Sequence, residues 1–166
     1  MSTQLNHTEI QTKDNSKELI VVADCIRTPE NIGMILRVSE GFGVKKVVFL
    51  GDSPDLSNRK VLKTARSTEK EIETVFTENW QKILIQLKEE NFTLIGLEIT
   101  DNSTVLKDFD FKKHPKIALF IGNERNGISA EILNELDFAV HFDLYGKNSS
   151  INVVNALSVG LYEILR

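Results

Sequence analysis

The sequence has few of the residues that cross-link or rigidify small folds. It contains one cysteine, three prolines and one tryptophan in 166 residues. Because Cys25 has no second cysteine to pair with, an intramolecular disulfide is excluded. No Cys/His cluster has zinc-ligand spacing, and no apolar run approaches the roughly 20 residues that cross a bilayer. The first residues are polar, without the hydrophobic stretch of a secretory signal. We therefore expect a cytoplasmic protein with no metal site and no membrane association.

A large excess of charge of one sign is also absent. The chain has 24 acidic and 20 basic residues and a net charge of −4, so bulk attraction to nucleic acid is not indicated. The local exception is SNRKVLKTARSTEK, residues 57–70, with a net positive charge. If this segment is helical, four of its cations share one face, which is either a solvated surface or an anchor for RNA phosphates. These RNA-binding candidates are Arg59, Lys63, Arg66 and Lys70.

The apolar pattern predicts alternating strands and helices. Continuous apolar runs predict strands at residues 19–25, 45–51, 72–76, 92–100, 116–122 and 138–144. Helical spacing predicts helices at residues 28–41, 78–91, 129–135 and 151–166. This order is typical of a single α/β domain with a parallel sheet, which we expect over residues 19–166 after a flexible arm at 1–18. Such sheets bind ligands beyond the carboxyl ends of their strands.

The first polar cluster at a predicted strand end is NIGMILR, residues 31–37. Asn31 and Arg37 are six positions apart, which places them roughly 120° apart around a helix. Gly33 early in a helix costs about 0.5–1 kcal/mol against alanine, which is explicable if something approaches the backbone closely. The simpler interpretation is a capping asparagine and a surface arginine.

The second cluster is IGNERNGIS, residues 121–129, in which Gly122 and Gly127 bracket four polar residues. It lacks the spacing of a dinucleotide fingerprint or a P-loop. The loop is either an ordinary turn between a strand and a helix or a cradle for a nucleoside or the charged end of an amino acid.

The third cluster is DLYGKNSSIN, residues 143–152, before the terminal helix. It is either a helix cap supplied by Ser149 or Ser150, or an anion-tolerant pocket beside a helix N-terminus. The helix itself is expected to bury a stripe consisting of Ile151, Val154, Leu157, Leu161 and Leu165.

In this order, the three clusters resemble the motifs of the SpoU (TrmH-like) family of RNA methyltransferases, in the SPOUT superfamily. The resemblance runs from about Ile20 to the C-terminus. The clusters are similar to the family patterns Asn-x-Gly-x-x-x-Arg, Gly-Asn-Glu-x-x-Gly-hydrophobic-Ser and Gly-x-x-x-Ser-hydrophobic-Asn-Val. The residues that carry it are Asn31, Gly33 and Arg37, then Gly122, Asn123, Glu124, Gly127, Ile128 and Ser129, then Gly146, Ser150, Ile151, Asn152 and Val153.

The resemblance implies a Rossmann-like α/β domain whose C-terminal segment forms a deep trefoil knot, and it implies a homodimer. The implied activity is transfer of a methyl group from S-adenosylmethionine (AdoMet) to a ribose 2′-hydroxyl of tRNA or rRNA. We expect tRNA rather than rRNA, because no separate RNA-recruiting domain is visible. The alternative is a non-catalytic α/β protein that binds RNA or a nucleotide through the same loops.

The resemblance also assigns roles to residues. Arg37 is implied either as the base or as the group that binds the adjacent phosphate. Asn31 is implied to orient Arg37 or the ribose, and Glu124 to anchor the arginine or its partner across the dimer. The implied catalytic set is Arg37, Asn31, Glu124, Ser150 and Asn152. The implied cofactor-binding set is Leu97, Glu98, Gly122, Asn123, Phe142, Leu144 and Ile151. Where the family usually has Ile-Pro-Met, this chain has Phe142-Asp143-Leu144, and Asp143 faces either the cofactor or solvent.

Overall fold

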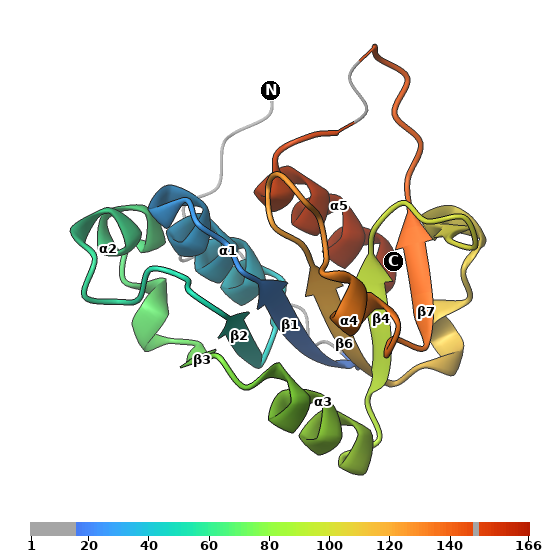
Figure 1. Ribbon diagram of the computed structural model, residues 1–166, viewed down its shortest axis with the longest axis horizontal. Coiled ribbons are helices and arrows are strands. Elements are labelled where there is room, and N and C mark those ends of the chain that lie inside the picture. Colours follow the sequence, from blue (N-terminus) through green and yellow to red (C-terminus); the bar gives the residue numbers. More distant parts are fainter. Residues whose placement is uncertain (1–15, 148–149) are drawn as a thin grey trace, which may run out of the picture.

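The computed structural model describes residues 16–147 and 150–166 and is organised around one parallel sheet (Figure 1). Seven strands lie in the order β3-β2-β1-β6-β4-β7-β5, and all the described pairings are parallel. The strands are β1 (Glu18–Asp24), β2 (Lys46–Leu50), β3 (Glu73–Thr77), β4 (Thr93–Leu97), β5 (Thr104–Val105), β6 (Lys116–Ile121) and β7 (Phe138–His141). The predicted α/β class is confirmed. The predicted arm, up to residue 15, lies outside the described residues.

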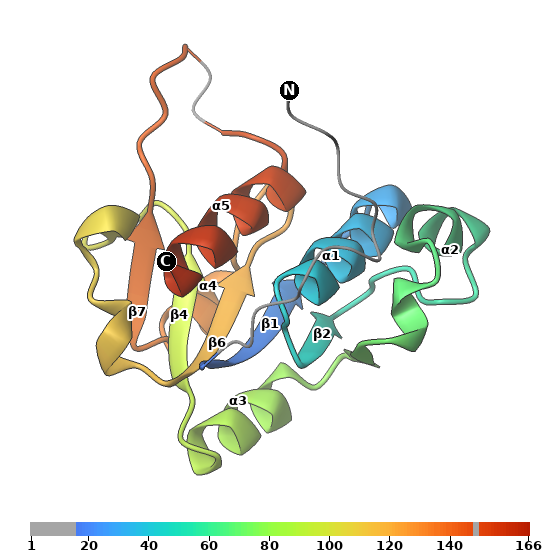
Figure 2. The same ribbon diagram turned by 180° about the vertical axis from the view of Figure 1, so that it is seen from behind.

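Helices cover both faces of the sheet. They are α1 (Pro29–Gly41), α2 (Arg59–Ala65), α3 (Trp80–Glu89), α4 (Ala130–Leu133) and α5 (Val153–Leu165), with short 3-10 turns at Thr68–Lys70, Leu106–Asp108 and Phe111–Lys113. Helices α1 and α5 lie on one face, and α3 and α4 lie on the other (Figures 1 and 2). Helix α2 packs mainly against α1.

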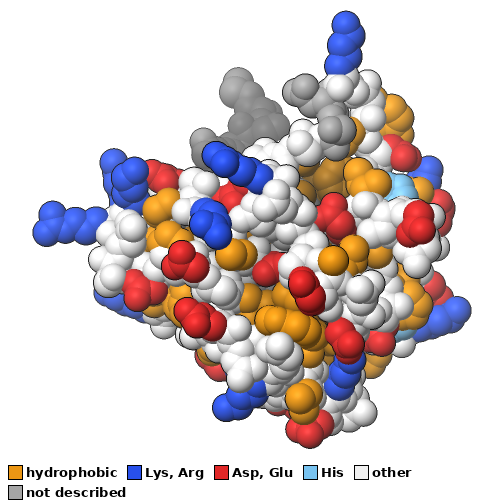
Figure 3. Space-filling view, in the orientation of Figure 1, with side chains coloured by type: hydrophobic (Ala, Val, Ile, Leu, Met, Phe, Trp, Pro, Cys, Tyr) orange, Lys and Arg blue, Asp and Glu red, His pale blue; other side chains and the backbone are white. Residues whose placement is uncertain are grey.

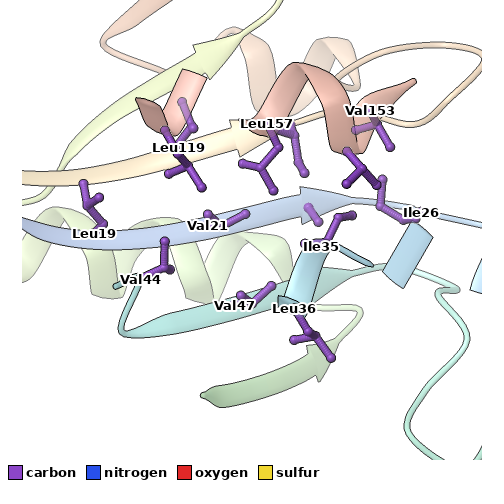
Figure 4. Packing of buried hydrophobic residues seen from close by; sticks show 14 of the residues in the cluster. Leu19, Val21, Ile26, Ile35, Leu36, Val44, Val47, Leu119, Val153 and Leu157 are labelled. Carbon is purple, nitrogen blue, oxygen red and sulfur yellow. The ribbon is translucent and has the colours of Figure 1, made fainter. Parts of the chain in front are cut away.

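The apolar runs form strands because both faces of the sheet are buried. In β1, Leu19 and Val21 point into the core beneath α1 and α5, whereas Ile20 and Val22 point into the core beneath α3 and α4. Alternate side chains point to opposite faces, so a strand covered on both sides reads as a continuous apolar run. Figure 4 shows labelled side chains of β1, α1 and α5 gathered in the first of these cores.

Helix α1 has the apolar stripe that its sequence predicts. Ile32, Ile35, Leu36 and Ser39 are all buried. The reason for Gly33 also becomes clear, because a Cβ atom at this position would overlap Thr64 Oγ1 and the carbonyl oxygen of Val61. Gly33 therefore allows α2 to pack closely against α1 at this position.

The prediction that the four cations of residues 57–70 share one helical face is wrong. Helix α2 ends at Ala65, and Arg66 and Ser67 adopt left-handed φ angles of 54° and 72°. These two residues turn the chain, so Lys70 falls in a separate 3-10 turn. Arg59 and Lys63 share the helix, Arg66 is its C-cap, and all four cations are exposed. The segment is basic, but its cations do not form one helical stripe.

The terminal helix begins later than expected. Its N-cap is Asn152, whose Oδ1 accepts a hydrogen bond from the amide of Val154 at 2.8 Å. This excludes the serine cap, one of the two alternatives that the sequence left open for the third cluster. Ile151 precedes the helix and is 42% exposed, so its predicted burial is also wrong. Val154, Leu157 and Leu161 are buried as predicted, and Leu165 is partly buried.

Candidate active site at the carboxyl edge of the sheet

A cleft of about 680 Å³ opens beyond the carboxyl ends of β4, β6 and β7, a size within the range of small-molecule sites. Its walls come from the segments that follow these strands and from the start of α5. All seven residues of the implied cofactor-binding set line it. Three residues of the implied catalytic set also line it, namely Glu124, Ser150 and Asn152. Segments distant in sequence therefore converge on one cavity.

Asn31, the first residue of the first motif, joins the other two motifs. Its Nδ2 donates to Glu124 Oε1 at 2.8 Å, and its Oδ1 accepts from Asn152 Nδ2 at 3.1 Å. Asn31 is only 9% exposed, at the start of α1. Asn152 in turn caps α5 through its Oδ1, so both faces of its amide are in use. The side chains of the three motifs thus form one hydrogen-bonded unit.

Three groups donate hydrogen bonds to the Glu124 carboxylate. Besides Asn31, the amides of Thr28 and Arg27 donate to its oxygens at 3.2 and 3.4 Å. Partial burial raises the pKa of the Glu124 carboxyl, but these hydrogen bonds and one from its own backbone together hold the pKa below its ordinary value. Glu124 is therefore ionised at neutral pH and acts as an acceptor that fixes the loop after β1.

Arg37 lies apart from the cleft. It is exposed and sits six residues, or about 9 Å of helical rise, beyond Asn31 on α1. It does not line the cleft, and Glu124 is bonded to Asn31 instead. Among residues 16–147 and 150–166, the guanidinium has no hydrogen bond or ion pair, which leaves its donors open to an anion from outside the chain.

The loop after β6, residues 122–129, has a backbone path that only glycine permits at two positions. A Cβ atom on Gly122 would overlap the backbone of Gly127 and Ile128, and Gly127 has a φ of +68°. Asn123 closes the loop through two backbone hydrogen bonds with Gly127, at 2.9 and 3.0 Å. Its side-chain Nδ2 also donates to the carbonyl of Cys25 at 2.6 Å.

The implied catalytic and cofactor-binding sets leave out three polar residues of the cleft. Arg125 and Asn126 occupy the two unspecified positions inside the second motif, and His141 is the last residue of β7. His141 Nδ1 lies 2.9 Å from Ser103 Oγ. Nothing in the sequence marks His141, because its partner belongs to a connection that carries no motif.

Asp143 faces away from the cleft. This exposed residue lines a separate pocket of about 210 Å³, together with Lys107, Tyr145 and Glu163. Of the two orientations that the sequence left open, the structure has the one toward solvent.

The described part of the chain has neither a cluster suited to a metal ion nor a helix suited to a membrane. There, no group of three or more His, Cys, Asp or Glu side chains is arranged to hold a metal ion. None of its helices combines the length and the hydropathy needed to span a bilayer.

Comparison with known proteins identifies relatives across this domain. A family model described as the SpoU rRNA Methylase family matches residues 18–162. The chain is 34% identical over 150 residues to the mouse (Mus musculus) tRNA (guanosine(18)-2′-O)-methyltransferase TARBP1, a match covering 89% of the chain and 9% of that protein. It is 26% identical to the Bacillus subtilis 23S rRNA (guanosine(2553)-2′-O)-methyltransferase RlmP, over 87% of the chain and 57% of the relative.

Solved structures agree with this assignment. The SpoU methyltransferase AviRb from Streptomyces viridochromogenes matches with a TM-score of 0.82 and 25% identity, over 92% of this chain and 60% of that one. The chain thus spans little more than half the length of the bacterial relatives described above. The matched family model covers most of the chain, and the chain belongs to the SpoU rRNA methylase family.

Proposed function

We propose that the protein is an AdoMet-dependent methyltransferase that methylates a ribose 2′-hydroxyl of tRNA or rRNA in the cytoplasm. The observation that carries the proposal is the bridge from Asn31 to Glu124 and Asn152 beside a cleft lined by the implied cofactor residues. Relatives named as tRNA and rRNA 2′-O-methyltransferases support the same reaction class for this chain.

The side chains of the cleft fit AdoMet, which supplies a methyl group from a sulfonium cation. Leu97, Phe142, Leu144 and Ile151 offer apolar surface suited to a purine ring. Glu98 and Glu124 line the cleft, and its described lining contains one arginine and no lysine, so the charge of this lining suits a cation.

In this proposal Arg37 binds the phosphate next to the target ribose and polarises the hydroxyl. A guanidinium is a donor of hydrogen bonds and has no lone pair that readily accepts a proton, so an arginine side chain suits phosphate binding better than the role of a base. The proton of the hydroxyl then leaves to phosphate or water. The exposed position of Arg37 suits contact with RNA rather than with the cofactor.

Because Arg37 lies outside the cleft of its own chain, we include a homodimer in the proposal. Exposed apolar side chains near α5 support self-association, since Tyr145 is 96%, Tyr162 62% and Val159 42% exposed. The trefoil knot that the resemblance implies for the C-terminal segment is likewise part of the proposal.

We place the RNA-binding surface of this proposal on the basic segment, residues 57–70. Figure 3 shows Lys and Arg side chains at the left end of the molecule, where Figure 1 places α2. Arg59, Lys63, Arg66 and Lys70 are exposed and belong to α2, its C-cap and the 3-10 turn that follows. Cations on a surface of this kind anchor phosphates without reading sequence.

The test is transfer of a deuterated methyl group. The protein is incubated with AdoMet labelled in its methyl group and with unmodified tRNA or rRNA transcripts, and digested nucleosides are analysed by mass spectrometry. We expect labelled 2′-O-methylnucleosides with the wild type and none with Arg37→Ala. Binding of AdoMet without transfer to any RNA would support the non-catalytic alternative, and a label on a base would contradict the proposed reaction.

A further inference from the structure

Two carboxylates hold the loop after β6 from opposite sides. Strand β6 lies between β1 and β4, and each neighbour ends in an acidic residue, Asp24 at the end of β1 and Glu98 directly after β4. Asp24 Oδ2 accepts from the amide of Ser129 at 2.7 Å, and Glu98 Oε2 accepts from the amide of Ile128 at 3.1 Å. Consecutive amides of the loop are thus bound to opposite neighbours.

Both contacts are costly to lose. Asp24 is only 8% exposed, so without the amide of Ser129 its buried carboxylate would lose a charge-assisted hydrogen bond. Glu98 uses both oxygens, because its Oε1 also accepts from the amide of Ile99 at 3.0 Å. The Glu98 carboxylate also lies where a Cβ atom on Gly127 would have to sit, so the left-handed residue packs directly on it.

The loop held in this way is a wall of the cleft. Residues 122–127 all line the cavity, and Glu124 on this loop also anchors Asn31. A shift of the loop would therefore change the cofactor cavity and the bridge between the motifs together. Glu98 lines the cleft, but Asp24 does not.

We propose that Asp24 and Glu98 are a pair of positioning residues that clamp the loop 122–129 and thereby set the affinity of the cleft for AdoMet. The inference rests on the proposed function for the identity of the ligand. Asp24 is outside the cleft, so it can change the affinity for AdoMet only through the loop. An effect of Asp24 on this affinity therefore distinguishes a clamp from direct contact with the cofactor.

The test uses the isosteric variants Asp24→Asn and Glu98→Gln, each of which turns an accepting carboxylate into an amide with one accepting oxygen. The matched control is Asp137→Asn, because Asp137 Oδ2 accepts from the amide of Leu94 at 2.8 Å near the opposite end of β4. A second probe of the Asp24 contact is Ser129→Pro, which removes the donor N–H at a residue whose φ of −59° suits proline.

AdoMet affinity is measured by calorimetry, and amide hydrogen exchange of residues 122–129 is measured without ligand. We expect both carboxylate variants to weaken AdoMet binding about tenfold and to speed exchange in the loop. Ser129→Pro should do the same at the remaining loop amides. For Asp24→Asn, which lies outside the cleft, the rate of methyl transfer at saturating cofactor should stay within about threefold of wild type. Asp137→Asn should bind AdoMet like the wild type, even if it melts earlier.

The outcomes separate the clamp from the proposed function. If the wild type does not bind AdoMet, the proposed function fails, and exchange in the loop alone decides whether the clamp exists. If Glu98→Gln weakens binding while Asp24→Asn and Ser129→Pro do not, Glu98 acts by direct contact and the clamp is overturned. Unchanged exchange at residues 122–129 in all three variants would also overturn it.

Discussion

The side-chain amide of Asn31 joins Glu124 to Asn152, donating to the first at 2.8 Å and accepting from the second at 3.1 Å. These contacts span 93 and 121 positions of the chain. The donor and acceptor ends of the Asn31 amide cannot be exchanged, because the Glu124 carboxylate can only accept and the free end of the Asn152 amide can only donate. The arrangement explains why asparagine, and not its acidic isostere, stands at the start of the first motif.

Asn31→Asp should therefore destabilise the protein. The substitution places a carboxylate oxygen against Glu124 Oε1 and removes a hydrogen bond, which should lower the free energy of unfolding by about 1–3 kcal/mol at pH 7. Urea denaturation measures the change. The control is Asn155→Asp on the exposed side of α5, expected to alter stability by less than about 0.5 kcal/mol. Equal stabilities of the two variants would show that the bridge contributes nothing.

The contribution of Glu124 should depend on pH in a defined direction. Its folded pKa lies below its ordinary value, so its ionised form stabilises the fold above the unfolded carboxyl pKa, near 4.3. That stabilisation is lost as the pH falls through the lower folded pKa. Wild type and Glu124→Gln are compared by urea denaturation from pH 7 to pH 3. Their difference in stability should be constant above about pH 5 and should shrink toward acid; a difference that grew toward acid would have the wrong sign.

Gly33 and Gly41 on the same helix should respond in opposite ways to alanine. Gly33→Ala would overlap Thr64 and Val61 of α2, so the two helices must separate, at a cost of about 1–3 kcal/mol. Gly41 has no atom within 4 Å of an added Cβ, so Gly41→Ala should be neutral or stabilise by up to about 1 kcal/mol. Thermal denaturation compares the two. A neutral Gly33→Ala would rule out the close packing of α1 on α2.

Arg37→Ala should abolish methyl transfer while leaving the fold and AdoMet affinity unchanged. The side chain is exposed and lies outside the cleft, so its removal takes away only the proposed phosphate contact. Arg37→Lys should restore little activity if the planar, bidentate guanidinium is needed. Transfer to RNA, calorimetry and melting temperature are measured on the same preparations. Loss of AdoMet binding in Arg37→Ala would place this residue at the cofactor instead.

Lys63→Ala should weaken RNA binding and its salt dependence together. Each phosphate contact contributes about 0.7–0.9 to the slope of log affinity against log salt, so loss of one contact should reduce the slope by about that amount. Lys113→Ala is the control, because Lys113 pairs with Asp110 in the turn before β6, outside the basic segment 57–70. Filter binding of tRNA at several salt concentrations gives both slopes. An identical slope for Lys63→Ala and wild type would remove α2 from the RNA interface.

Local patterns predict the elements of this fold well. The strands β1, β2 and β6 can be recognised in the sequence as continuous apolar runs, because a strand buried on both faces has few polar positions. Prediction fails where one residue decides the path of the chain. The spacing of the four cations indicates one helical face, but α2 ends at Ala65 because Arg66 and Ser67 adopt left-handed φ angles without a glycine to mark the turn.

Contacts across the fold are harder to predict. The need for Gly33 comes from Thr64 and Val61, and the role of Asp24 comes from Ser129 on a strand-end loop 105 positions away. No local periodicity encodes such contacts. The motifs marked Asn31, Glu124 and Asn152 as related, but their order along the bridge follows only from the packing of α1, the loop after β6 and α5.

The central claim is that the cleft beyond β4, β6 and β7 holds the methyl donor. A crystal structure of the protein grown with AdoMet tests this most directly. We predict one AdoMet molecule per chain, seated between the loop 122–127 and the segment that contains Phe142 and Leu144. Electron density for AdoMet elsewhere on the molecule, with this cleft empty, would contradict the account.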